Sequence, residues 1–149
     1  MGNLKLESFD FSHGGEIPRE CGYKNGNEEP PLAVSGIPKK TSSLVLIMDD
    51  PDAMGAVGKV WVHWVFWNIN YKTAAMGNNN QNGTEGMTDF GEVGYGGPAP
   101  PDKRHTYVFK LYALDTELDL PDKSTKADVE KAMEGHIIEQ TQLTGTYAP

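Results

Sequence analysis

The sequence predicts a mainly β protein with one domain spanning residues 1–149. Two short apolar runs, Leu44–Met48 and Val60–Trp67, are rich in β-branched and aromatic residues and are bounded by turn residues, which is typical of strands. A third run with the same character is His105–Leu114. The 17 glycines and 10 prolines indicate many loops, so we expect more strand than helix. A chain of this length suits one domain with a sizeable core.

The overall charge and the single cysteine narrow the classes of function. A net charge of −8 argues against nucleic acid as a partner and against stable membrane association, because both rest on basic surface. The lone Cys21 cannot form an intrachain disulfide, so we expect a packing residue in a reducing compartment. Residues 1–20 have no apolar core of the signal-peptide type, and no run approaches membrane-spanning length. We therefore expect a soluble cytoplasmic protein.

The remaining strands and loops follow from local composition. Leu4–Phe11 roughly alternates apolar and polar residues and predicts an edge strand, and Leu32–Ser35 predicts a brief one. The central pair of runs does not alternate, which is typical of strands that are covered on both faces, and a glycine-containing loop joins the two. Gly77–Gly86 predicts a polar surface loop. Gly91–Pro101 predicts a stiff loop whose backbone N–H groups can point at an anion.

The C-terminal part of the chain predicts helix. Ser124–Thr125 can cap a helix that has Asp128 in its first turn. Apolar residues then recur at steps of three and four as far as Leu143, which predicts one amphipathic helix, or two that are broken near Gly135. His136 lies on the apolar side of this helix, so we expect a packed structural histidine.

The acidic loop between the two central runs is close to a histidine. Alternation along a strand puts His63 on the same face as Trp61, Val65 and Trp67. A polar ring among large apolar groups needs a hydrogen-bond partner, because burying it unpaired is costly. The nearest candidates in the sequence are Asp50 and Asp52.

The third strand carries two polar residues at its start. His105 and Tyr107 begin a face that continues as Phe109, Leu111 and Ala113. These two residues directly follow the Gly/Pro loop, so the pattern predicts the rim of a pocket that leads into the core.

Four interpretations fit these side chains. In an anion pocket, His63 and His105 donate N–H bonds, Tyr107 donates its O–H, and Asp50 and Asp52 orient the imidazoles and favour their charged form. A metal site is the second interpretation, since two histidines and a carboxylate form a known ligand set. The third is acid–base or hydrolytic catalysis by an Asp–His pair, although no serine or cysteine lies in a recognisable nucleophile motif. The fourth is purely structural.

The motifs at these positions resemble those of a known family. The blocks are Asp50-Pro51-Asp52-Ala53, Trp61-Val62-His63-Trp64, Gly94-Tyr95-Gly96-Gly97-Pro98, His105-Thr106-Tyr107 and Ala132-Met133-Glu134-Gly135-His136-Ile137. In this order they resemble the phosphatidylethanolamine-binding protein (PEBP) family, in particular its bacterial and archaeal Raf kinase inhibitor-like branch. The resemblance covers about residues 9–147.

The resemblance carries expectations for fold and function. It implies a PEBP-like fold with a large central sheet packed on a smaller sheet and a C-terminal helical segment. It implies a pocket for phosphate-type anions, without a metal or other cofactor. The pocket residues that it implies are Asp50, Asp52, His63, Gly96, His105 and Tyr107. It also implies a binding or regulatory protein rather than an enzyme, with homodimers and inhibition of kinases or proteases known among relatives.

Our leading hypothesis is a non-enzymatic protein that binds a small anionic or phosphorylated ligand and regulates or inhibits a kinase or another protein. The alternatives are a hydrolase or transferase acting on phosphate or acyl esters through an Asp–His pair, and a protease inhibitor. The chain departs from the family pattern at Met54, where relatives usually have proline, and at Asp102–Arg104, which is short and lacks the usual glycine. We expect the second departure to change access to the pocket.

Overall fold

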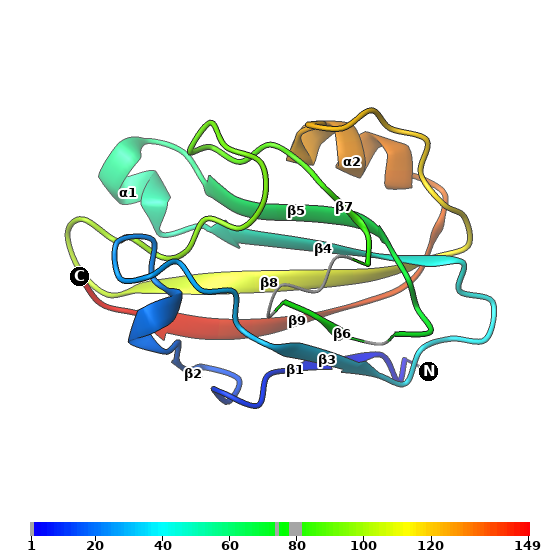
Figure 1. Cartoon of the computed structure of the whole chain (residues 1–149), viewed down its shortest axis with the longest axis horizontal. Coiled ribbons are helices and arrows are strands. Elements are labelled where there is room, and N and C mark those ends of the chain that lie inside the picture. Colours follow the sequence, from blue (N-terminus) through cyan, green and yellow to red (C-terminus); the bar gives the residue numbers. More distant parts are fainter. Residues whose placement is uncertain (1, 74, 78–81) are drawn as a thin grey trace.

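The computed structural model describes residues 2–73, 75–77 and 82–149, so residues 78–81 of the predicted surface loop lie outside the described part. The described residues form two β-sheets, with two α-helices and one 3₁₀ turn (Figure 1). The larger sheet has the strand order β2-β9-β8-β4-β5-β7, and the smaller sheet has the order β1-β3-β6. The predicted mainly β, two-sheet fold is confirmed.

The strands β8, β4 and β5 lie at the centre of the larger sheet and position the site. The smaller sheet packs on one face of these strands, and α2 packs on the other. The larger sheet consists of β2 (Gly15–Glu16), β4 (Ser43–Asp50), β5 (Trp61–Ile69), β7 (Thr84–Glu85), β8 (His105–Leu114) and β9 (Ile137–Tyr147). The smaller sheet consists of β1 (Lys5–Glu7), β3 (Leu32–Ser35) and β6 (Ala75–Met76). The helices are α1 (Ala53–Val57) and α2 (Lys126–Met133), and the 3₁₀ turn η1 is Arg19–Cys21. Neighbouring strands are antiparallel except for β2 and β9.

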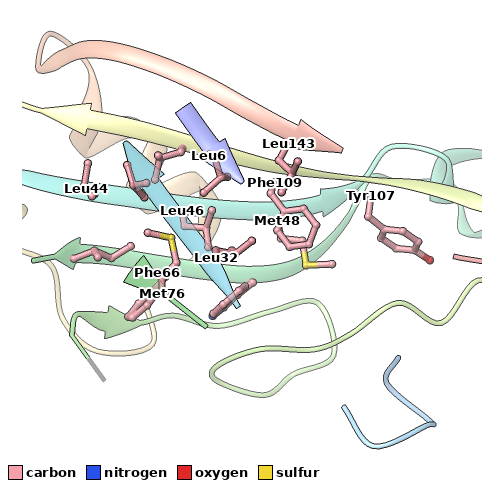
Figure 2. Packing of buried hydrophobic residues seen from close by; sticks show 14 of the residues in the cluster. Leu6, Leu32, Leu44, Leu46, Met48, Phe66, Met76, Tyr107, Phe109 and Leu143 are labelled. Atoms are coloured by element: carbon pink, nitrogen blue, oxygen red, sulfur yellow. The ribbon is translucent and has the colours of Figure 1, made fainter. Parts of the chain in front are cut away.

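The main core lies between the two sheets. Side chains of β4, β5 and β8 meet side chains of the smaller sheet there, and all of them are buried (Figure 2). The core includes Leu6, Leu32, Leu46, Met48, Phe66 and Phe109. In Figure 2, Tyr107 lies at one end of this row, and its hydroxyl points away from the other labelled side chains. The apolar face of β8 therefore leads to a polar group at its start, as predicted.

The opposite face of the larger sheet is covered by α2. The second apolar cluster contains Val45 and Ile47 of β4, Val65 and Trp67 of β5, and Val129 and Met133 of α2. The carboxylate of the buried Asp49 accepts hydrogen bonds from Lys126 of α2, at 2.8 Å, and from Lys110 of β8, at 3.1 Å. Since both faces of β4 and β5 are covered, neither strand alternates apolar with polar residues, as the sequence indicated.

The prediction of helix as far as Leu143 is wrong. The start of the helix is as predicted, since Thr125 and Asp128 form a reciprocal capping box. After α2 the backbone turns at Gly135, which has a φ of 80°, and the chain continues as β9. This strand pairs with β8 over its whole length, and Leu143 and Tyr147 alternate inward. The chain therefore ends on a strand, and the helical segment precedes it.

The expected burial of His136 is also wrong. Its side chain is exposed and its Nδ1 lies 2.8 Å from the carboxylate of Asp115. His136 lies in the turn between α2 and β9, so it is not part of a helix and does not share an apolar helix face with Val129 and Met133.

Smaller differences concern the ends of the elements. The predicted first strand is confirmed only at Lys5–Glu7, at the edge of the smaller sheet, whereas Leu32–Ser35 is confirmed as β3. The expected loop after β4 contains the short helix α1, and the predicted surface loop contains Thr84–Glu85, which pairs with β5. Cys21 is buried, and burial raises the pKa of its thiol to about 12, as suits a packing residue. Within the described residues, neither helix has the length and apolar character that crossing a bilayer requires.

Candidate functional site

A cavity of about 150 Å³ lies at the end of the larger sheet where α1 and the C-terminus are found (Figure 1). A single water occupies roughly 10–15 Å³ in such a cavity, and drug-sized ligands need about 300–1,000 Å³, so this one suits a small group of several atoms. The polar and aromatic side chains that line it are Asp50, Trp61, His63, Phe90, His105 and Tyr107. They come from the ends of β4, β5 and β8 and from the loop that follows β7.

A larger groove of about 650 Å³ lies between the N-terminal segment and β9. Its lining includes Phe9, which is 88% exposed, and His13. Every ionisable side chain in that lining is exposed. The smaller cavity is the better candidate site, because convergent buried titratable groups are characteristic of functional sites.

A β-bulge sets the position of His63. The residues opposite Met48 and Asp49 of β4 are Trp64 and Val62 of β5, so His63 is one extra residue between them. An extra residue shifts the alternation of side chains along a strand and re-aims the residue at that point.

The bulge turns His63 toward the core between the two sheets. The imidazole contacts the rings of Tyr107 and Phe90 edge to face, with centroids 5.1 and 5.3 Å away. Val65 and Trp67 instead pack on the α2 side of the sheet. The prediction that His63 shares a face with these two residues is therefore wrong, because simple alternation does not cross a bulge.

The partner of His63 is a backbone carbonyl. Its Nδ1 donates to the carbonyl oxygen of Gly96 at 2.6 Å, and the N–H of Gly96 donates to the carbonyl of His63 at 2.8 Å. The sequence had suggested Asp50 or Asp52 as this partner, which is wrong. Burial lowers the pKa of His63, so the ring is neutral near pH 7. In the described part of the chain Nε2 makes no hydrogen bond, which leaves a lone pair on a ring that lines the cavity.

Gly96 can approach the site this closely because it has no side chain. A Cβ at this position would lie 2.4 Å from the ring of Phe90, which itself lines the cavity. Gly96 therefore contributes to the wall of the site through its backbone, as the resemblance implied, and it does so by holding His63.

His105 lies between two carboxylates. Its Nδ1 is 2.6 Å from Oδ2 of Asp50, and its Nε2 is 2.7 Å from Oδ1 of Asp102. Burial opposes the charged ring, but the hydrogen bonds and charges of the two carboxylates outweigh it and raise the pKa of His105. The predicted Asp–His pair therefore exists, but the histidine is His105 and both of its N–H groups are occupied.

The pairing of Asp102 was missed by sequence reasoning. The signal for it was a carboxylate three residues before His105, in a segment that departs from the family pattern. Burial acts to raise the pKa of Asp102, but the hydrogen bond from His105, the backbone hydrogen bonds and the charge of His105 together outweigh it, so the pKa is lowered. The Asp102 side chain is 44% exposed, so it closes the pair from the solvent side.

Two buried polar atoms of the cavity have no partner. Oδ1 of Asp50 and the hydroxyl of Tyr107 are both inaccessible to solvent, and within the part of the chain that the structure describes neither makes a hydrogen bond of ordinary length and angle, although the Asp50 carboxylate and the Ala99 backbone are close enough to the phenol to act on its pKa. Burial, and then the charge of Asp50, raise the pKa of Tyr107 well above its usual value, so the phenol stays protonated and can donate. Buried polar atoms without partners are rare and costly, which makes them markers of a missing ligand or water.

The comparison with known families agrees with this geometry. Residues 7–148 match the family model described as phosphatidylethanolamine-binding protein. The chain belongs to the phosphatidylethanolamine-binding protein (PEBP) family. This match covers nearly the whole chain, and the resemblance seen in the motifs is confirmed.

Relatives in archaea and bacteria support the assignment to the PEBP family. A protein of Methanothermobacter thermautotrophicus, named UPF0098 protein, is 40% identical over 97% of this chain and 98% of its own length. A UPF0098 protein of Chlamydia trachomatis is 37% identical over the same shares. These names state no activity.

Solved structures support the PEBP fold. The putative phosphatidylethanolamine-binding protein homolog CT736 of Chlamydia trachomatis superposes with a TM-score of 0.91 at 36% identity, covering 99% of this chain and 98% of its own. YBCL of E. coli, described as a new member of the mammalian PEBP family, gives a TM-score of 0.88 at 28% identity and covers 98% of each chain.

Within this PEBP fold, Asp52 lies outside the cavity. It is exposed, and its carboxylate accepts a hydrogen bond from the backbone N–H of Thr106 at 2.8 Å. It therefore braces the start of β8 next to the site, whereas Asp50, His63, His105 and Tyr107 share the cavity.

The Gly/Pro loop contributes fewer free donors than expected. The N–H of Gly96 is bound to the carbonyl of His63, and the N–H of Gly97 donates to Oδ1 of Asn27 at 2.7 Å. These amides are not free to bind an anion. Across the described residues, no group of three or more His, Cys, Asp or Glu side chains is arranged to hold a metal ion.

Proposed function

We propose that this PEBP-family protein is a non-enzymatic binding protein for a small phosphate-type anion. The observation that carries the proposal is the pair of unpartnered buried atoms, Tyr107 Oη and Asp50 Oδ1, in one small cavity with the free Nε2 of His63. A ligand that hydrogen-bonds these atoms relieves the cost of leaving them unpaired.

The ligand is held by His63 and Tyr107 in this proposal. The protonated phenol of Tyr107 donates its O–H to a ligand oxygen. The charge of a bound anion stabilises the imidazolium form of His63, so binding raises the pKa of the ring and converts Nε2 from an acceptor into a donor. Because the pKa of free His63 is lowered by burial, affinity for the anion increases as the pH falls.

A ligand reaches His105 only by replacing Asp102. The Asp102 carboxylate holds the Nε2–H of His105, it is partly exposed, and it follows directly after Pro101, which lines the cavity. An incoming oxyanion makes the same charge-assisted hydrogen bond that this carboxylate makes. Asp102 is therefore an internal competitor of the ligand, and Asp50 keeps His105 oriented in both states.

The contacts favour binding over catalysis by an Asp–His pair. A histidine that acts as a general base needs one ring nitrogen free and the other held by an orienting group. In His105 both nitrogens are taken, and His63 is oriented by a carbonyl rather than by a carboxylate. Among the residues that the structure describes, no serine or cysteine lines the cavity. Turnover of phosphate or acyl esters that disappears in Asp50→Asn would favour the enzyme instead.

We also propose a regulatory role toward a kinase or another protein, with a cytoplasmic location and a homodimer as further expectations. The cavity is lined by two exposed apolar residues, Val57 and Pro101, which suit contact with whatever carries the anionic group. Inhibition assays on kinases and on proteases test this role, and sedimentation tests the dimer. Inhibition of a protease without any anion binding would favour the protease-inhibitor alternative.

Calorimetric titration with inorganic phosphate and with a phosphomonoester tests the binding proposal. We expect dissociation constants of about 1 mM or tighter, which corresponds to roughly 4 kcal/mol of binding free energy. A crystal grown in phosphate is expected to show the anion between His63 and Tyr107. If neither anion produces heat or a chemical-shift change at His63 at tens of millimolar, the proposal fails.

A further inference from the structure

The cavity offers more hydrogen-bond acceptors than donors. Oδ1 of Asp50 only accepts, and the neutral ring of His63 presents a lone pair at Nε2. The hydroxyl of Tyr107 both donates and accepts. A ligand without hydrogens therefore finds one donor, and it also meets the Asp50 carboxylate at close range.

From this imbalance, and resting on the proposed function, we infer that the ligand brings its own hydrogen-bond donor: it is a protonated oxyanion, such as a hydrogen phosphate group, and not a fully deprotonated one such as sulfate. The P–OH donates to Oδ1 of Asp50. A second ligand hydrogen, where present, is donated to Nε2 of His63 or transferred to it. The Tyr107 hydroxyl donates to an unprotonated ligand oxygen.

Asp50 is the specificity-determining residue in this inference. Its Oδ2 is committed to His105 at 2.6 Å, so its Oδ1 cannot turn away from the ligand without breaking that bond. Facing this oxygen, an anion that carries no hydrogen leaves the carboxylate unsatisfied and adds like-charge repulsion. Sites that are built to hydrogen-bond a particular ligand hydrogen reject analogues that lack it much more strongly than sites that merely fill space.

The direct test compares inorganic phosphate with sulfate on the full chain at pH 6, by calorimetry or by NMR titration. Both anions are tetrahedral, but only phosphate carries hydrogens at this pH. We expect phosphate to bind at least about tenfold more tightly than sulfate. Equal affinities for the two anions would overturn the inference.

Asp50→Asn changes the acceptor into a donor with little change of shape. The amide oxygen can still accept from His105, and the NH₂ group then occupies the place of Oδ1. We expect the ratio of phosphate to sulfate affinity to fall to about one in this variant. The matched control is Asp52→Asn, which removes an exposed carboxylate outside the cavity and is expected to keep the wild-type ratio. A ratio that survives in Asp50→Asn would overturn the assignment of Asp50.

A pH series needs no variant. A phosphomonoester loses its last P–OH hydrogen with a pKa near 6, whereas inorganic phosphate keeps one hydrogen at pH 8. Between pH 5 and pH 8 we expect the affinity for the ester to fall by at least about threefold more than that for inorganic phosphate. Protonation of His63 affects both ligands alike, so a parallel fall of the two would contradict the inference.

These outcomes separate this inference from the proposed function. If no anion binds, the proposed function fails and the inference fails with it. If phosphate and sulfate bind equally well, the cavity is an anion site, and only the requirement for a ligand hydrogen is wrong.

Discussion

Two histidines, His63 and His105, each form one part of the lining of the cavity, and their pKa values are shifted in opposite directions. His63 is 2% exposed and His105 is 1% exposed, yet the pKa of His63 is lowered and that of His105 is raised. Burial disfavours the imidazolium of both rings. At His105 two carboxylates overcome this effect, whereas at His63 a carbonyl oxygen does not. The direction of each pKa shift is a balance between burial, which disfavours the imidazolium, and the hydrogen-bond partners and charges beside the ring, which favour it.

The two histidines also differ in how many of their ring nitrogens are hydrogen-bonded. His105 has both ring nitrogens hydrogen-bonded to carboxylates, and it ties β8 to β4 through Asp50. His63 is a neutral ring with one nitrogen free, so it can respond to a ligand. In the proposed function, His105 is therefore the structural part of the site, and His63 is the part that responds to the ligand. The following experiments are designed to break or to sharpen that contrast.

The largest effect, on the free energy of unfolding, is expected from removing Asp50, the buried carboxylate that is hydrogen-bonded to His105. Asp50→Ala leaves a buried imidazole without its inner partner, and breaking one side of a buried ion pair costs about 3–5 kcal/mol. We expect the free energy of unfolding in urea at pH 7 to fall by about this amount. Asp102→Ala removes the solvent-side partner, and its unfolding free energy is expected to stay close to that of the wild type. If the free energy of unfolding fell equally in the two variants, the buried bond to Asp50 would not be the main stabilising contact of His105.

The next largest effect is expected on ligand affinity when His63 is replaced. His63→Ala removes the responsive donor, and we expect affinity for a phosphomonoester to fall at least about tenfold, or about 1.4 kcal/mol, as for a hydrogen bond to a charged group. Calorimetry checks this value. His13→Ala, at an exposed histidine in the groove beside β9, is the matched control and is expected to bind as the wild type does. Unchanged affinity in His63→Ala would count heavily against the site.

A smaller effect of opposite sign is expected at Asp102. Asp102→Ala removes the internal competitor for Nε2 of His105, and we expect phosphate to bind about threefold to tenfold more tightly, because the competent state is more populated. Weaker binding in this variant would mean that Asp102 supports the ligand instead of competing with it.

The pH dependence of the two rings gives the finest test. We expect NMR titration to place the pKa of His105 above, and that of His63 below, the ordinary value of about 6.5. Stability from His105 is present below about pH 6.5 and is lost as the pH rises through its raised pKa. Stability from neutral His63 is present above about pH 6.5 and is lost as the pH falls through its lowered pKa. The reverse order of titration would refute the assigned partners.

Local composition was sufficient to predict the central strands β4, β5 and β8, but it was not sufficient to predict the last strand, β9. β4, β5 and β8 are apolar runs with turn residues at their ends, and the start of α2 has an explicit cap. The residues of β9 show apolar spacings that are compatible with a helix, because steps of three and four can be found in a mixed sequence. Its strand conformation is decided by pairing with β8 at ten of its eleven residues, and that partner lies far away in the sequence.

Most members of the site were predictable, and its pairings only in part. The motifs placed Asp50, His63, His105 and Tyr107 together, and all four line one cavity. The expected bond between Asp50 and an imidazole exists at His105, whereas the carboxylate partner expected for His63 was wrong, because a bulge at His63 cannot be read from alternation.

Proximity in the sequence also misled the assignment of the carboxylates. Asp102 was passed over although it lies only three residues before His105, because spacing alone does not show whether the chain between them turns the two side chains toward each other. Asp52 was overvalued because it stands next to Asp50 in the motif, although its carboxylate binds the backbone of Thr106 outside the cavity.

The sequence by itself determined the fold class, the family and the set of chemical groups at the site, because these depend on composition, periodicity and short motifs. Only the tertiary structure decided in which direction the pKa of each histidine is shifted and which polar atoms are left for a ligand. The physical reason is that pKa values and hydrogen bonds are set by contacts of a few ångströms, and those contacts arise from a bulge, a glycine and a loop brought together by folding.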